Sequence, residues 1–427
     1  MRKIDIKVGI HWNLVSYVFL GLFMLFSYCM ITWWYGKAAL GVYNIVLSVF
    51  MICGHVGVFG LQSAAIYFIP RQSDDRNKLG QCFFSFLTIA IIVSLSLAGL
   101  IFLSSGVMGN FIFKSEYVSE GLQMMSPSLV LFSVNKLIGG YINGMGRMRQ
   151  FAILQSIRYF FIVIYIGFIA LMQLEFHFIF YAFLVSEIGV LITGIIFLNK
   201  KISFQRPQKS FIITGIKFGA QAMLGNVISD INTRVDIMML GVLCEDAVVG
   251  SYSFVTIIAE GVISILFVFR SNFNPHFADL LFENKIRDLS SLLKDQRKKL
   301  SGFFTVLGIF ILVGYTVFCR VLLEDSYIAS IPCVLIILIG CVVMAPYFVF
   351  GNVCTLYGKP FIDTSITLFT ILSNGLLNYI LISKFEITGA ALATCISYIV
   401  FSVLTFWAVR KILKSARNNG HEAVEKL

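Results

Sequence analysis

The sequence predicts an all-α polytopic membrane protein, and three observations lead to this class. Hydrophobic residues make up 58% of the 427 positions and charged residues only 13%, whereas a soluble globular chain has roughly 25% charged residues. Apolar runs of about 20 residues, each long enough to cross a bilayer, recur along the whole chain. The runs are continuous rather than alternating, which favours helices over a closed barrel as the means of satisfying the backbone in lipid.

We expect about twelve transmembrane helices. Between them, the longest connection expected on the inner side is leucine-rich and basic, which predicts an amphipathic helix at the membrane surface over residues 277–299. A basic tail follows at 410–427. The predicted spans lie near residues 12–34, 42–69, 82–103, 126–145, 151–172, 178–198, 219–242, 250–272, 301–322, 331–351, 361–382 and 388–409.

The positions of Lys and Arg predict the orientation. With the N-terminus inside, 24 of these residues fall in inner segments and three, Lys37, Lys114 and Lys384, in outer loops. Inner loops normally carry the excess of positive charge, so we expect both termini in the cytoplasm. The net charge of +11 then follows from this bias and from contact with anionic membrane lipids, and it does not indicate a nucleic-acid partner.

Motifs for enzymatic chemistry and for cofactors are not found in the sequence. The nine cysteines are scattered without a CxxC pair, which is typical of small apolar packing residues rather than of a metal or disulfide framework. No phosphate-binding loop, zinc spacing or nucleophile elbow is present. We therefore expect a transporter rather than an enzyme, with no cofactor, and leave proton or sodium coupling open.

Two weak internal matches predict a repeat. "LGVYNIVLSVF" at 40–50 aligns with "VGSYSFVTIIA" at 249–259, which pairs Gly41 with Gly250. The turn "MGRM" at 145–148 aligns with "YGKP" at 357–360 at nearly the same offset. The matches predict two parallel six-helix lobes, 1–210 and 211–427. In such folds the substrate path usually runs between the halves near the membrane midplane.

The predicted span 219–242 contains three charges, Asp230, Arg234 and Asp236. A charge in mid-bilayer costs at least about 2.5–3.5 kcal/mol on insertion scales. Asp230 and Arg234 are four residues apart and can pair on one helix face. Two interpretations stay open: a structural salt bridge between helices, or a water-filled cavity that binds a charged ligand.

Further charged residues within the predicted spans support a cavity. Basic side chains can hold phosphate or acidic sugars, whereas acidic side chains and a histidine can carry protons or sodium or hold the basic ones in place. A single histidine among glycines is more commonly a packing residue. The candidate substrate-binding residues are Lys136, Arg158, Arg234 and Arg270, and the candidates for counter-charge or ion coupling are Asp230, Asp236, Glu260, Glu187 and His55.

Three segments resemble a known family, the O-antigen and capsular polysaccharide flippases of the multidrug/oligosaccharidyl-lipid/polysaccharide exporter superfamily. The segments are "NTRVDIMMLGVLCEDAVVGSYSFVTIIAEG" (232–261), "NPHFADL" (274–280) and, after "GKP" (358–360), "ILSNGLLNYILISKFEITGAALATCISY" (371–398). The resemblance implies a V of two lobes around a central cavity. It also implies flipping of an undecaprenyl-diphosphate-linked oligosaccharide across a bacterial inner membrane, with polymerase and chain-length proteins of the same pathway as potential partners.

Three rival interpretations stay open at this stage. A drug or cation antiporter of the same superfamily would favour acidic and aromatic cavity residues, whereas the set found here is partly basic. A major-facilitator transporter usually has a long central loop, and the loop at 199–210 is short. An O-antigen polymerase would carry a large periplasmic loop, and none of the predicted outer loops is long.

Overall fold

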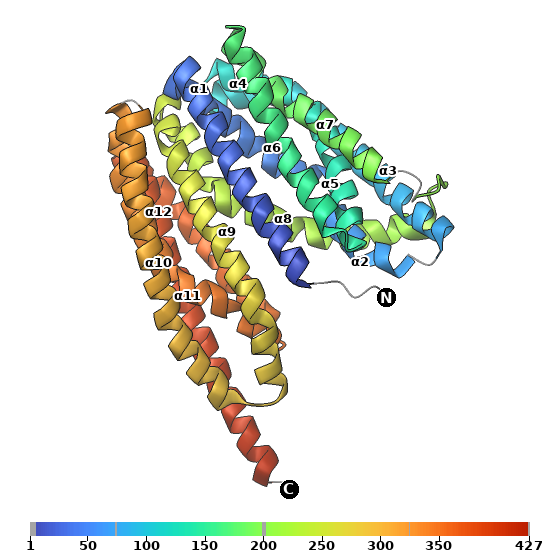
Figure 1. The fold of residues 1–427 in the computed structure, drawn as a ribbon, viewed down its shortest axis with the longest axis vertical. Coiled ribbons are helices and arrows are strands. Elements are labelled where there is room, and N and C mark those ends of the chain that lie inside the picture. The colour runs from blue at the N-terminus through green and yellow to red at the C-terminus, as the bar shows by residue number, and fades with distance from the viewer. Residues whose placement is uncertain (1–5, 73–74, 199–201, 324, 426–427) are drawn as a thin grey trace. The chain divides into compact units, whose positions relative to one another are not determined.

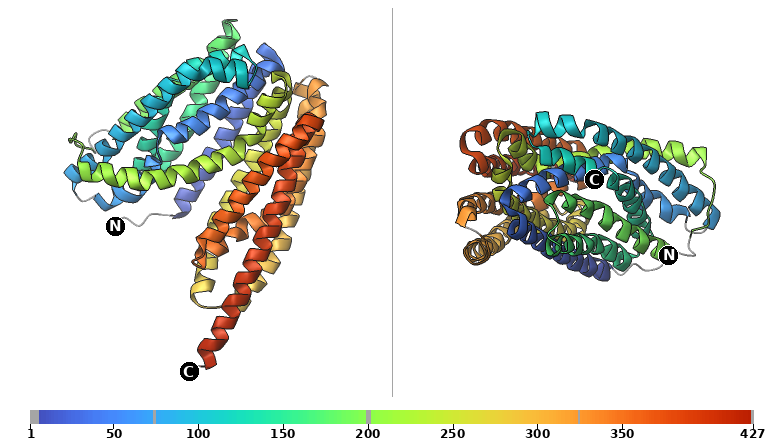
Figure 2. Two further views of the ribbon diagram at one scale, coloured as in Figure 1. Left: turned by 180° about the vertical axis from the view of Figure 1, so that it is seen from behind. Right: turned by 90° about the horizontal axis from the view of Figure 1, so that it is seen from above.

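The computed structural model describes residues 6–72, 75–198, 202–323 and 325–425, and the regular secondary structure of these residues is helical. The chain forms two compact units, Met1–Gly250 and Ser251–Leu427. Figures 1 and 2 show that each unit is a bundle of long helices. This confirms the all-α membrane class predicted from the apolar runs.

The first unit is built around a central helix, α5. This helix packs against α2, α3, α6 and α7, while α1 packs against α6, and α8 crosses α1, α2 and α3. Short 3-10 or π segments, η1 (Ile69–Gln72), η2 (Met108–Ile112) and η3 (Phe176–Phe180), join some of the helices. The α-helices are α1 (Ile6–Gly57), α2 (Leu61–Phe68), α3 (Arg76–Val107), α4 (Glu116–Met125), α5 (Ser128–Gly144), α6 (Met148–Leu171), α7 (Tyr181–Leu198) and α8 (Lys209–Leu243).

The second unit contains three long helices that pack side by side and most of a fourth. Helix α11 packs against both α10 and α12, and in Figure 1 the last turns of α12 extend past the ends of its neighbours. The first turn of α9 belongs to the first unit. The elements are α9 (Asp246–Phe282), α10 (Ile286–Leu322), η4 (Asp325–Ser330), α11 (Ile331–Leu356) and α12 (Pro360–Glu425).

Nine helices in the described part of the chain are long and apolar enough to cross a membrane. Two of them contain two predicted spans each, because α1 bends at Gly36 (φ 82°) and α12 bends at Glu386 (φ 47°). The predicted span 126–145 corresponds to α5, whose 17 residues fall short of the roughly 20 that a full crossing needs. The multi-pass class is confirmed, and the count of twelve stays a prediction.

The amphipathic helix predicted over 277–299 is not a separate element. Its first residues are the end of α9, the chain reverses at 283–285, and its remainder is the start of α10. Asn284 has a positive φ of 53° at the reversal. Leu289 and Leu293 are buried within the protein, so part of the leucine periodicity comes from packing within a helical hairpin, and contact of this segment with a membrane surface stays a prediction.

The two turns matched in the sequence have the same backbone hydrogen bonds. In the first, Met145 N–H donates to Tyr141 O, Gly146 N–H to Asn143 O and Arg147 N–H to Ile142 O, at 3.0, 2.8 and 3.1 Å. The second turn repeats these three bonds 212 residues later, at 2.9, 3.0 and 3.0 Å. Both turns place a glycine in the left-handed region, with φ of 71° at Gly146 and 83° at Gly358.

The other matched pair, Gly41 and Gly250, forms a close helix crossing. A Cβ on Gly41 would lie 1.9 Å from Asp246 O, and a Cβ on Gly250 would lie 1.8 Å from Lys37 O. Each glycine thus faces the carbonyl four residues before the other, which is the reciprocity expected where two symmetry-related helices meet. Both observations support the internal repeat. The lobe boundary at 210/211 stays a prediction, since the compact first unit also includes α8.

Candidate functional site

A buried ion pair lies at the centre of the first unit. The Glu187 side chain on α7 is fully buried, and Arg158 on α6 is 8% exposed. Arg158 Nε donates to Glu187 Oε1 at 2.5 Å and its Nη2 to Oε2 at 3.2 Å. Asn135 on α5 donates from Nδ2 to Glu187 Oε2 at 2.7 Å and to the Glu187 carbonyl at 2.8 Å. The carboxylate is therefore compensated by a two-pronged guanidinium contact and an amide.

The ring of Phe132 lies beside both basic groups of this region. Lys136 Nζ is 5.2 Å and Arg158 Cζ 5.0 Å from the ring centroid, within the range of a cation–π attraction. Phe132 and Lys136 are one helical turn apart on α5, so they share a face. Gly54 on α1 makes room for the ring, because a Cβ there would lie 2.5 Å from Phe132 Cε1.

A second charged contact joins α1 to α8. His55 Nδ1 contacts Asp230 Oδ2, and it also lies 3.2 Å from the Met51 carbonyl. The His55 ring stands edge-on to Phe132, at 6.2 Å and 88°. The sequence suggested a partner for Asp230 on its own helix, and the structure places a histidine from a different helix in contact with this carboxylate.

Lys136 differs from these paired groups. It makes no hydrogen bond or ion pair with any residue that the structure describes, although the charges of Arg158, Asp230 and Glu187 act on it. It lines a cavity of about 240 Å³ between α2, α5, α6 and α7. Arg158 and the polar side chains of Gln62, Asn135 and Gln155 line the same cavity.

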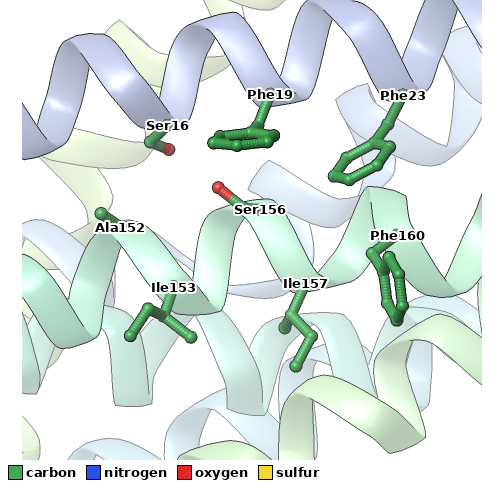
Figure 3. A pocket seen from close by; sticks show the side chains of 8 residues that line it. All are labelled: Ser16, Phe19, Phe23, Ala152, Ile153, Ser156, Ile157 and Phe160. Carbon is green, nitrogen blue, oxygen red and sulfur yellow. The ribbon is translucent and has the colours of Figure 1, made fainter.

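The opposite face of α6 lines a different, apolar groove of about 330 Å³ against α1. Phe19 and Phe23 of α1 and Phe160 of α6 are among the side chains that line it (Figure 3). The hydroxyls of Ser16 and Ser156 are the only polar groups among the eight side chains drawn. The two faces of one helix therefore line a charged cavity and an apolar groove, and the charged candidates gather at the first of these.

Arg270 lies in the second unit, in a cluster of its own. Its Nη2 lies 3.0 Å from Asn352 Oδ1 and 3.4 Å from Asp363 Oδ2, and its Cζ is 5.4 Å from the Phe348 ring centroid. Glu260 is ten residues earlier on the same helix, about three turns away.

The remaining candidates are Arg234 and Asp236 on α8. Asp236 is 8% exposed and Arg234 is partly exposed, and both have interaction partners elsewhere in the chain. Of the nine residues singled out in the sequence, the structure thus brings His55, Lys136, Arg158, Glu187 and Asp230 together around Phe132. Whether any of the nine binds substrate or an ion stays a prediction.

Sequence reasoning missed the neutral members of the site. Gln62, Asn135 and Gln155 lie in apolar stretches, and Asn135 directly precedes Lys136. Their position in apolar stretches was a usable signal, because a buried polar side chain needs a hydrogen-bond partner, just as a buried charge needs a counter-charge. Phe132 gave no such signal, since aromatic residues are common throughout these helices.

Comparison with solved structures identifies the fold. A MATE family multidrug resistance transporter of the MOP superfamily in an inward-facing conformation superposes with a TM-score of 0.77 at 13% identity, over 93% of this chain and 96% of that one. A MOP superfamily transporter from Pyrococcus furiosus, described by the reverse polarity of its binding pocket, gives 0.67 at 13% identity over 96% of both chains. The chain has the fold of a MOP superfamily transporter.

Sequence comparison identifies the family. Residues 7–280 match the polysaccharide biosynthesis protein family, and the chain belongs to that family. An uncharacterized membrane protein of Methanocaldococcus jannaschii is 23% identical over 95% of this chain and 84% of its own length. The resemblance to a polysaccharide-related family that the sequence suggested is confirmed by the family match, and the predicted fold is confirmed by the solved structures.

Proposed function

We propose that this protein is a flippase. It moves an undecaprenyl-diphosphate-linked oligosaccharide, an O-antigen or capsule repeat unit, from the cytoplasmic to the periplasmic leaflet of a bacterial inner membrane. Membership of the polysaccharide biosynthesis family supports a saccharide cargo. The likeness to MOP superfamily transporters supports movement by alternating access, in which no bond is made or broken.

The single observation that carries the proposal is the state of Lys136. Arg158 contacts Glu187 and Asp230 contacts His55, whereas the Lys136 ammonium has no hydrogen-bond or ion-pair partner among the described residues. A cation at depth in a membrane is costly unless something compensates it. An anionic group of the cargo that enters the cavity provides that compensation.

The same observation disfavours the antiporter of drugs and cations. A cation-binding pocket needs a carboxylate that is available to the cargo. Both carboxylates of this cluster, Glu187 and Asp230, are already in contact with basic side chains. Arg234 and Arg270 stay candidates for further basic contacts with the cargo, each within its own unit. The candidates for proton or sodium coupling stay His55, Asp230, Asp236, Glu187 and Glu260, of which Asp236 and Glu260 are not part of this cluster.

A cellular test follows from the leaflet to which the cargo is delivered. In a host that lacks this gene, the lipid-linked oligosaccharide should resist a periplasmic glycosidase, and expression of the protein should make it accessible. Equal accessibility with accumulation of single repeat units would favour the polymerase alternative. Equal accessibility with normal glycan would contradict the flippase and favour the drug exporter.

A further inference from the structure

We propose that the cavity lined by Gln62, Asn135, Lys136, Gln155 and Arg158 binds one sugar residue that carries a single negative charge, namely a carboxylated monosaccharide of the uronic acid type. The proposal rests on the proposed function and deepens it. It assigns this cavity, which lies inside the first unit between α2, α5, α6 and α7, to the glycan rather than to the diphosphate of the carrier lipid.

The charge of the cavity lining fits one negative charge. Two basic side chains, Lys136 and Arg158, line the cavity. The contacts of Arg158 with Glu187, at 2.5 and 3.2 Å, cancel the charge of the guanidinium. One positive charge is left, which matches a carboxylate. A diphosphate diester carries two negative charges, and the second would be buried beside Glu187 without a compensating cation.

One polar atom of a lining residue lacks a hydrogen-bond donor within the described part of the chain. Asn135 is 3% exposed, and its Nδ2 donates to two oxygens of Glu187. Because both of those partners are acceptors, the orientation of the amide is fixed. Its Oδ1 is buried with no partner among the described residues. Sugar hydroxyls are donors that this oxygen lacks, whereas a diphosphate diester has no proton to give.

The size and the remaining lining also suit a monosaccharide. The cavity volume of about 240 Å³ lies below the roughly 300–1,000 Å³ of pockets for drug-sized ligands, so it holds one small unit and not a whole repeat unit. The amides of Gln62 and Gln155 each offer donors and an acceptor to hydroxyl groups. The Phe151 ring and Leu154 provide apolar surface for the C–H face of a pyranose.

Ligand-induced thermal stabilisation of the purified full-length protein in lipid nanodiscs tests this assignment. The probes are D-glucuronate, D-glucose and inorganic pyrophosphate at matched ionic strength, since a ligand that binds the native state raises Tm with its concentration. We expect D-glucuronate to bind more tightly than D-glucose, and both more tightly than pyrophosphate. Lys136→Gln should lower the affinity for D-glucuronate by about tenfold or more and leave the affinity for D-glucose almost unchanged.

Matched variants keep the result interpretable. Gln155→Leu changes the cavity face of α6 and should lower the affinity for both sugars. Ser156→Ala changes the opposite face, in the apolar groove, and should leave both affinities unchanged. Gln155→Leu makes the test independent of whether Lys136→Gln folds. Tightest binding of pyrophosphate, dependent on Lys136, would overturn the proposal in favour of a diphosphate site. Equal binding of both sugars, or binding of none, would overturn it while leaving the leaflet-accessibility result unaffected.

Discussion

At the scale of single residues, the site is defined by which charges are paired. Glu187 has no exposure and depends on Arg158 and Asn135, and Asp230 depends on His55. Within the described cluster, Lys136 alone faces a cavity without a hydrogen-bond or ion-pair partner. A lysine is a point charge with three donors and a flexible stem, which suits it to a cargo that arrives and leaves.

Removal of Arg158 should strongly destabilise the protein. Arg158→Met leaves a carboxylate buried without a cation, and breaking such a pair typically costs about 3–5 kcal/mol. The double variant Arg158→Met with Glu187→Leu should recover most of this loss, because no charge is left unpaired. Thermal unfolding in detergent measures the stability of the single and of the double variant. If the double variant were no more stable than the single one, the pair would not be the source of the effect.

Lys136 should matter for transport and little for folding. Lys136→Gln should reduce delivery of the glycan to the outer leaflet by roughly tenfold or more, since a charge-assisted hydrogen bond contributes about 1.5–3 kcal/mol, while protein abundance stays close to normal. Lys136→Arg keeps the charge and should retain part of the activity. A collapse of abundance in Lys136→Gln would show instead that the lysine is structural.

At the scale of helices, the close approach of α1 and α9 depends on two glycines. Gly41→Ala and Gly250→Ala each place a Cβ within 2 Å of a backbone carbonyl of the other helix. Overpacking of this kind typically costs about 1–3 kcal/mol or more. Thermal unfolding should therefore show both variants to be less stable than the parent.

The control for this crossing is Gly314→Ala. Gly314 lies within α10, and its added Cβ would meet nothing within 4 Å. Since alanine is favoured over glycine inside a helix by roughly 0.5–1 kcal/mol, this variant should be as stable as the parent or slightly more so. Equal destabilisation of all three variants would contradict the account of the crossing.

The two matched turns allow a paired prediction. Gly146 and Gly358 both have positive φ and end a helix with the same three hydrogen bonds. Gly146→Ala and Gly358→Ala should each cost about 1–2 kcal/mol, because a Cβ disfavours the left-handed region. Unfolding measurements should give similar losses for the two. A loss at one turn only would show that the turns are not equivalent.

At the scale of the whole molecule, the sequence predicted the class of fold and much of the helix pattern. Apolar runs identify helices because lipid allows few alternatives. The bends at Gly36 and Glu386 and the break before α2 were placed only by the structure, since one hydropathy run can hold two helices or part of one. The reversal at 283–285 within the predicted surface helix was not foreseen, because an amphipathic pattern fits a packed hairpin as well as one continuous helix.

The candidate site was predictable in part. The cost of a charge in lipid was enough to single out His55, Lys136, Arg158, Glu187 and Asp230. Their pairing was not predictable, because α5, α6 and α7 bring together residues far apart in the sequence. The i,i+4 spacing of Asp230 and Arg234 suggested a local pair, yet His55 of α1 holds the aspartate, since tertiary packing offers partners that spacing on one helix cannot reveal.

The most direct measurement of the central claim is flipping by the purified protein. Proteoliposomes would contain the protein, a lipid-linked oligosaccharide loaded in both leaflets, and an external glycosidase that cleaves only the accessible glycan. Without protein, cleavage should stop at about half of the substrate. With the parent protein it should proceed towards completion, and with Lys136→Gln, present at equal amount, much more slowly. Cleavage that stopped at the same level with and without the parent protein, under every ion gradient applied, would contradict the account.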